Sequence, residues 1–202
     1  MKYLITILSI IILFSNIDCS RGCIEAQYNF SMQEVFYPEH DTILVGDTIF
    51  MESSHSTTFN DTLINKSIDF SGSDIGGSLR LLRFPDTSTI PVGGINNFEI
   101  LIFYGKSSGN DNIPSENKGF YFVEDNNQYI LKLGFIAKQK GIYSISLGNS
   151  IGIIKRKSSC EKANITIINT NNNNHLYFYQ NWRPGYLIPE YERTHIYCFI
   201  VK

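Results

Sequence analysis

Short segments in which apolar and polar residues alternate recur along this chain, and turn-forming residues divide them. In the clearest segment, residues 129–135, every second residue is apolar, and residues 143–147 alternate with serine in the same way. Alternation with a period of two is typical of strands that bury one face, and signals for helices are nearly absent. The pattern therefore predicts an all-β protein built from short strands.

About ten short strands are expected, and they favour a β-sandwich over an α/β fold. A polar turn at residues 124–128 predicts a hairpin. Residues 53–65 and 106–118 are expected to form surface loops, and the Asn-rich residues 170–174 a tight connection. The expected strands are residues 28–30, 34–37, 48–52, 79–84, 98–104, 120–123, 129–135, 143–147, 163–168, 175–179 and 195–201.

Composition bounds the domain count and the class of partner. Of the 202 residues, 43% are hydrophobic and 18% charged, which is ordinary for one globular domain. No shift in composition and no repeat divides the chain, so we expect one sandwich domain at residues 23–202. The net charge of −2 argues against a nucleic-acid partner, because such proteins carry a basic surplus on one face.

The N-terminus has the organisation of a secretory signal. Met1-Lys2 is followed by an apolar run from Tyr3 to Phe14, which is too short to cross the roughly 30 Å of bilayer hydrocarbon. We expect residues 1–22 to form a signal helix that is removed on export. The mature protein is then expected at the outer membrane, facing the periplasm, or at the cell surface.

Two cysteines near the signal leave the mode of attachment open. Cys23 follows Gly22 and is the better lipid-acceptor candidate, whereas Cys19 follows Asp18, a poor fit to a cleavage site for small residues. Neither cysteine lies in a good lipoprotein box, so ordinary cleavage to a free secreted protein is the alternative. A lipid at Cys23 would be the chain's only membrane contact.

The two late cysteines are expected to pair. An exported chain meets oxidising conditions, so Cys160 and Cys198 are predicted to form a disulfide that closes one long loop. The chain has no Cys-x-x-Cys motif, and His195, three residues before Cys198, would face the other side of a strand. We therefore predict no metal site and no cofactor.

Two stretches carry a resemblance to a known class of domain. Residues 37–49, with Gly46-Asp47-Thr48, resemble the first strands of bacterial immunoglobulin-like sandwich domains, and Lys140-Gly141-Ile142-Tyr143 is similar to their late Gly-x-Tyr strand. The whole layout, up to the closing residues 191–198, resembles uncharacterised envelope lipoproteins of Gram-negative bacteria. The resemblance implies an immunoglobulin-like antiparallel β-sandwich, with extra strands and long polar loops, and it implies no activity.

Catalytic motifs are missing from the sequence. There is no Gly-x-Ser-x-Gly elbow, phosphate-binding glycine loop, His-Glu-x-x-His motif or dinucleotide fingerprint. Glu190 and Glu192 would share one strand face, but neighbours on one strand cannot flank a scissile glycosidic bond. We therefore expect no enzymatic activity.

The segment 177–197 is unusually aromatic, and aromatic rings beside Arg and Asn donors suit recognition of sugars or proteins. Packing of a long loop against the sheet is the alternative explanation. The sequence thus predicts an exported protein with a structural or binding role and an unknown protein or glycan partner at the cell envelope. The other hypothesis is a carbohydrate-binding or carbohydrate-active protein. The candidate binding residues are Trp182, Arg183, Tyr186 and Tyr191.

Overall fold

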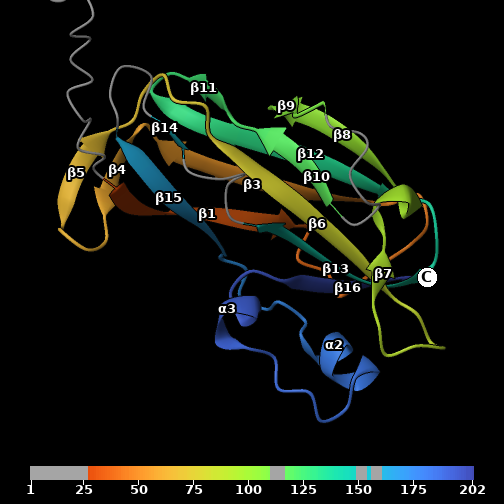
Figure 1. Ribbon diagram of the computed structural model, residues 1–202. Helices are drawn as coiled ribbons and strands as arrows, with labels where there is room; N and C mark the ends of the chain where they lie inside the picture. Colours follow the sequence, from red (N-terminus) through yellow and green to blue (C-terminus); the bar gives the residue numbers. More distant parts are fainter. Residues whose placement is uncertain (1–26, 110–116, 149–153, 156–160) are drawn as a thin grey trace, which may run out of the picture.

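Two β-sheets packed face to face make up most of the structure, and two short helices lie outside the second sheet (Figure 1). The computed structural model describes residues 27–109, 117–148, 154–155 and 161–202. The predicted signal helix, Cys19, Cys23 and Cys160 lie outside these residues.

Each sheet has seven strands. The first contains β1 (Gln27–Tyr37), β3 (Thr48–Ser56), β8 (Phe98–Tyr104), β11 (Val123–Asp125), β12 (Gln128–Ala137), β14 (Ile154–Lys155) and β15 (Lys162–Asn169). The second contains β2 (Thr42–Ile43), β6 (Gly76–Phe84), β7 (Val92–Gly93), β9 (Lys106–Ser107), β10 (Asn117–Tyr121), β13 (Gly141–Gly148) and β16 (Tyr197–Val201). The other elements are the hairpin β4 (Thr58–Asp61) and β5 (Lys66–Asp69), η1 (Ile95–Asn97), α2 (Tyr177–Trp182) and α3 (Glu190–Arg193).

The strand order is β11-β12-β3-β1-β15-β14 in the first sheet, with β8 also paired to β12. In the second sheet it is β2-β16-β13-β6-β10-β9, with β7 also paired to β6. Most pairs are antiparallel, but β1 runs parallel to β15 and β16 runs parallel to β2. The predicted all-β sandwich is confirmed, with these two parallel pairs added.

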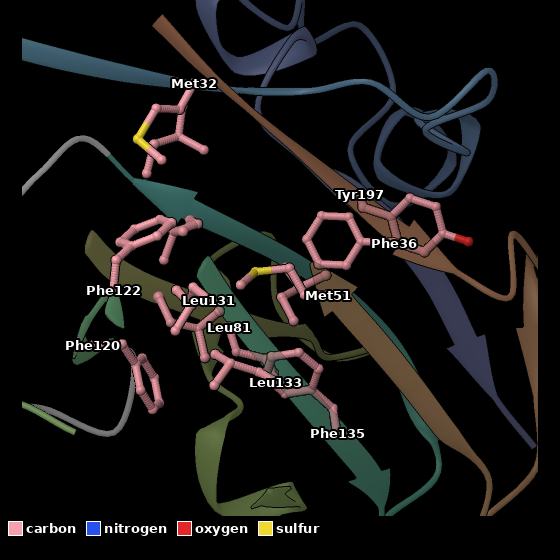
Figure 2. Close-up of a cluster of buried hydrophobic side chains, with 14 of the residues drawn as sticks. Met32, Phe36, Met51, Leu81, Phe120, Phe122, Leu131, Leu133, Phe135 and Tyr197 are labelled. Atoms are coloured by element: carbon pink, nitrogen blue, oxygen red, sulfur yellow. The ribbon is translucent and has the colours of Figure 1, made fainter. Parts of the chain in front are cut away.

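The alternating segments form the core between the sheets, as the pattern predicts. Leu131, Leu133 and Phe135 on β12 are fully buried and point toward Leu81 of the second sheet (Figure 2). Each such side chain contributes roughly 1.5–3 kcal/mol by leaving water. Farther along, Phe36 of β1 stacks on Tyr197 of β16 with ring centroids 5.1 Å apart, which ties the first sheet to the second.

Local turn chemistry explains several strand starts. Gly46 has a φ of +95°, and the Asp47 carboxylate accepts a hydrogen bond from the Leu44 N–H at 2.8 Å immediately before β3 begins. Asn126 and Asn127 have φ values of 48° and 61° and join β11 to β12 as a two-residue hairpin turn. The predicted hairpin therefore exists, although Phe120 belongs to β10 in the second sheet.

Three predicted elements are wrong in whole or in part. Residues 175–179 do not form a strand: His175 has a φ of +50° and the helix α2 starts two residues later. Aromatic residues at every second position suggested a strand. In the structure this segment instead lies over the outer face of the second sheet, where Tyr179 packs against Phe84. Residues 53–65 are not one loop, since β3 continues to Ser56 and β4 pairs with β5. Residues 106–118 are not one loop either, since β9 and the start of β10 lie within them.

Candidate ligand-binding cleft

The segment between β15 and β16 covers part of the second sheet's outer face (Figure 1). That face is apolar at one end, where Leu82 and Phe84 of β6 lie beside Cys198 of β16. Exposure of these side chains to water would be unfavourable, so α2 and the following loop pack over them. The side chains that provide the cover are Leu176, Phe178, Tyr179, Trp182, Tyr186 and Ile188.

Trp182 belongs to this cover. Its indole stacks on Phe84 with centroids 4.7 Å apart and an interplanar angle of 21°, and its Nε1–H donates to the Pro85 carbonyl oxygen at 2.9 Å. Tyr186 is half-buried against Tyr179, and the exposed Arg183 guanidinium lies 4.3 Å from the centre of the Tyr186 ring. Trp182 and Tyr186 therefore have a packing role in this segment.

A cleft of about 650 Å³ opens where the cover ends and the outer face of the sheet becomes polar. Its floor consists of side chains from three neighbouring strands. In the strand register, Arg80 of β6 lies between Asn117 of β10 and Ser146 of β13. Ser144 and Gly148 on β13 are also short. Because these side chains are small, space remains above the sheet and Arg80 is the one long polar side chain of this row.

The wall beside this floor is formed by residues of α3 and by the residues that follow it. Tyr191 is 67% exposed, and its hydroxyl donates to the Glu192 carboxylate at 3.3 Å. His195 is held by its Nδ1, which contacts the Tyr191 carbonyl oxygen and lies 2.9 Å from Thr194 Oγ1. Leu82 and Ile196 add apolar surface. The cleft thus combines an aromatic ring, apolar patches and polar groups of both hydrogen-bonding types.

The cleft contains groups of opposite charge, Glu192 and Arg80, near the Tyr191 hydroxyl. Glu192 raises the pKa of the Tyr191 hydroxyl, and the positive charge of Arg80 acts on that hydroxyl in the opposite sense. Within the described part of the chain, the Arg80 guanidinium makes no hydrogen bond or ion pair. A guanidinium without a protein partner has its donors available to a ligand.

Of the four predicted binding residues, the structure places Tyr191 in the cleft wall. Trp182, Arg183 and Tyr186 do not line it. Sequence reasoning missed Arg80 and the serine floor. The signal was present, because the alternation of residues 143–147 predicts a face of serines, but nothing in the sequence shows which segment lies above that face.

Glu190 and Glu192 do not converge on the cleft. Glu192 lines it, whereas the Glu190 side chain is 83% exposed and lies 3.9 Å from Arg193. Among the described residues no group of three His, Cys, Asp or Glu side chains is placed to hold a metal ion.

Cys198, one half of the predicted disulfide, is fully buried on β16 and has a free thiol among the described residues. Burial raises the pKa of this thiol. Cys160 and Cys23 lie outside the described residues, so the disulfide and the lipid site stay predictions.

A second exposed surface lies on the outer face of the first sheet. Tyr37 stacks on Phe50 at 5.3 Å, and Phe50 contacts Phe103 at 5.8 Å, with Phe103 50% exposed. Beside these rings, Lys132 Nζ lies 3.2 Å from the Glu52 carboxylate. We call Tyr37, Phe50 and Phe103 the aromatic platform. Its charged neighbours are already paired, unlike Arg80 in the cleft.

Comparisons with known proteins give no family. No protein-family model matches the chain, and no curated protein matches it. No helix within the described ranges is long and apolar enough to cross a membrane.

Three solved structures have low similarity to the chain. The human F-spondin reeler domain has a TM-score of 0.32 and 13% identity, over 74% of this chain and 93% of that one. A type II cohesin–X-dockerin complex from Acetivibrio cellulolyticus has a TM-score of 0.33 and 12% identity, over 70% and 96%. A type II cohesin dyad from the same organism has a TM-score of 0.34 and 12% identity, over 70% and 47%. At such TM-scores no function transfers, and the envelope-lipoprotein resemblance gains no support.

Proposed function

We propose that this chain is an exported, non-enzymatic binding protein whose cleft holds a polyhydroxylated ligand such as a segment of a glycan. The observation that carries the proposal is the Arg80 guanidinium, which has no hydrogen-bond or ion-pair partner among the described residues and lies near Tyr191 on a floor of small polar residues. The cleft volume of about 650 Å³ lies in the range of small-molecule sites.

The mixture of groups in the cleft suits a saccharide. Arg80 and Asn117 offer N–H donors, the Glu192 carboxylate accepts, and Ser146 does both. A sugar presents hydroxyls at its rim and C–H groups on its faces, and the exposed Tyr191 ring can pack on such a face. One positive group on the floor and one negative group on the wall favour a neutral ligand over a strongly charged one.

Binding without turnover is the role that fits these carboxylates. Glycoside hydrolysis by the common mechanisms uses two carboxyl groups on either side of the scissile bond. Glu192 is the one carboxylate among the described residues that line the cleft. The proposal therefore includes no catalytic residue.

Export and attachment belong to the same proposal. The apolar run from Tyr3 to Phe14 supports removal of residues 1–22, and Gly22-Cys23 supports a lipid at Cys23. The tethered domain would then meet glycans or proteins of the cell envelope. Intact mass of the mature wild type and of Cys23→Ser tests this step, since a lipid increment must appear in the first and vanish in the second.

The cleft is tested by steric filling. The mature chain is screened against soluble neutral and acidic oligosaccharides, and each hit is titrated by calorimetry. Ser146→Trp should abolish binding by filling the floor, and Arg80→Ala should weaken it about tenfold, or about 1.4 kcal/mol. Ser54→Trp, on an exposed position of β3, is the matched control and should bind like the wild type. No binding to any saccharide, or equal binding by Ser146→Trp, would refute the proposal.

A protein partner is the second candidate. The observation that favours it is the aromatic platform, where Phe103 is 50% exposed on β8 beside Phe50. Exposed aromatic side chains are enriched at protein interfaces.

A further inference from the structure

The tip of the β4–β5 hairpin displays two adjacent aliphatic side chains to solvent. Leu63 is 76% exposed and Ile64 is 60% exposed. Single exposed apolar residues are common on protein surfaces, but two neighbours at the end of a projecting hairpin form a small apolar point.

The tip is held in one conformation. The buried Asp61 side chain accepts hydrogen bonds through Oδ1 from the Leu63 N–H and the Ile64 N–H, each at 2.8 Å. These bonds lower the pKa of Asp61, so its carboxylate is charged at neutral pH. Asn65 closes the turn with a φ of +50°, and its N–H donates to the Asp61 carbonyl oxygen at 3.0 Å. These hydrogen bonds fix the backbone that carries both aliphatic side chains.

The hairpin tip lies beside the start of β1. The Asn29 N–H donates to Asp61 Oδ2 at 2.8 Å, and the Thr62 N–H donates to the Asn29 carbonyl oxygen at 3.0 Å. Figure 1 shows β4 and β5 at the end of the sandwich where β1 begins, away from α2.

The length of chain that precedes β1 fixes how far this end can be from a membrane. Asn29 lies six positions after Cys23, and a fully extended chain of that length spans at most about 20–22 Å. A lipid on Cys23 would therefore keep the hairpin tip close to the bilayer surface. A flexible lipid tether holds the domain at the membrane without fixing its orientation, so a second contact near the anchor would determine which face meets the bilayer.

We infer that Leu63 and Ile64 insert into the interface of a phospholipid membrane and orient the sandwich on it. The inference rests on the proposed tether at Cys23. Lys66, exposed at the start of β5, suits the headgroup layer because its apolar stem can lie along the acyl boundary while its ammonium reaches phosphate. In this orientation α2, at the other side of the molecule, faces away from the bilayer.

The test uses depth-dependent quenching. The lipidated full-length product is reconstituted into phosphatidylethanolamine–phosphatidylglycerol vesicles, with and without brominated acyl chains. Leu63→Trp places a fluorophore at the tip, where the exposed side chain makes the substitution compatible with folding. Leu44→Trp is the matched control, because Leu44 is also aliphatic and 58% exposed, but both residues next to it hydrogen-bond the C-terminal Lys202, which lies at the end of the sandwich away from β4 and β5 (Figure 1).

Brominated lipid should reduce the added Leu63→Trp emission about twofold and leave the Leu44→Trp emission and native Trp182 unchanged. Unquenched Leu63→Trp emission from a chain whose intact mass includes the lipid would overturn the inference and leave the tether standing. A chain without any lipid increment would overturn the tether, and the inference would fall with it.

Discussion

A carboxyl group in the sandwich core gives the sharpest stability prediction. Glu34 of β1 points inward and is 1% exposed; its Oε1 accepts from the Leu147 N–H at 3.5 Å, and its Oε2 has no partner among the described residues. Burial disfavours the charged form and raises the pKa of Glu34 from 4.5 to about 8. The folded protein therefore holds Glu34 protonated at neutral pH.

The size of the effect follows from this pKa. In the unfolded chain Glu34 ionises near its ordinary pKa of 4.5, whereas the folded chain keeps the proton until about pH 8. The stability associated with neutral Glu34 is complete below pH 4.5 and is lost as the pH rises toward 8. At about 1.4 kcal/mol per pH unit, the loss is about 3 kcal/mol at pH 7 and about 5 kcal/mol above pH 8.

Glu34→Gln removes the titration, because the neutral amide has no proton to lose. Urea unfolding at pH 5, 7 and 8 gives the free energy of unfolding of each protein. The free energy of unfolding of the variant, relative to that of the wild type at the same pH, should rise by about 2–3 kcal/mol from pH 5 to pH 7. Any packing cost of the amide is the same at both pH values, so it cancels when the two free-energy differences are compared. Glu99→Gln, which removes an exposed carboxylate on β8, controls for loss of one charge. A wild type–Gln difference that stays constant from pH 5 to 8 would refute the reasoning.

Two substitutions and one labelling experiment test the buried contacts described above. Tyr129→Phe should lower the free energy of unfolding by about 1–2 kcal/mol, because the hydroxyl donates to the Phe70 carbonyl oxygen at 2.6 Å and accepts from the Ser73 N–H at 3.0 Å; equal urea midpoints would contradict this. Trp182→Phe keeps a ring at that position but loses the indole hydrogen bond to Pro85, and calorimetric melting should show a loss of about 1 kcal/mol; an unchanged melting temperature would show that this hydrogen bond does not stabilise the fold. With any disulfide first reduced, Cys198 should react with iodoacetamide only when urea unfolds the chain, and rapid alkylation of Cys198 itself in the native protein would contradict its burial.

The local part of this fold is readable in the sequence. Alternation at residues 129–135 predicts β12 and its buried face, and Gly46-Asp47 marks the turn into β3. These signals depend only on residues close in the sequence, so they can be recognised without knowing which strands pair. The non-local part is not readable: the parallel pairing of β1 with β15 joins residues more than 130 positions apart.

The cleft was only half predictable for the same reason. The serines of β13 predict a polar face and Tyr191 lies in a segment chosen for its aromatic residues. Arg80 could not be assigned, because its role depends on the register of β6 against β13 and on the position of α3. Trp182 was chosen as a binding residue for its type, but the apolar Phe84 beneath it determines its packing role.

The most direct test of the proposed binding site is to map it by NMR. Backbone amide shifts of the isotope-labelled mature chain are recorded while the tightest-binding oligosaccharide is added. The account predicts shifts concentrated at residues 78–82, 144–148 and 191–196, which form the floor and wall of the cleft. Shifts confined to the aromatic platform, with Arg80 and Ser146 unmoved, would contradict it.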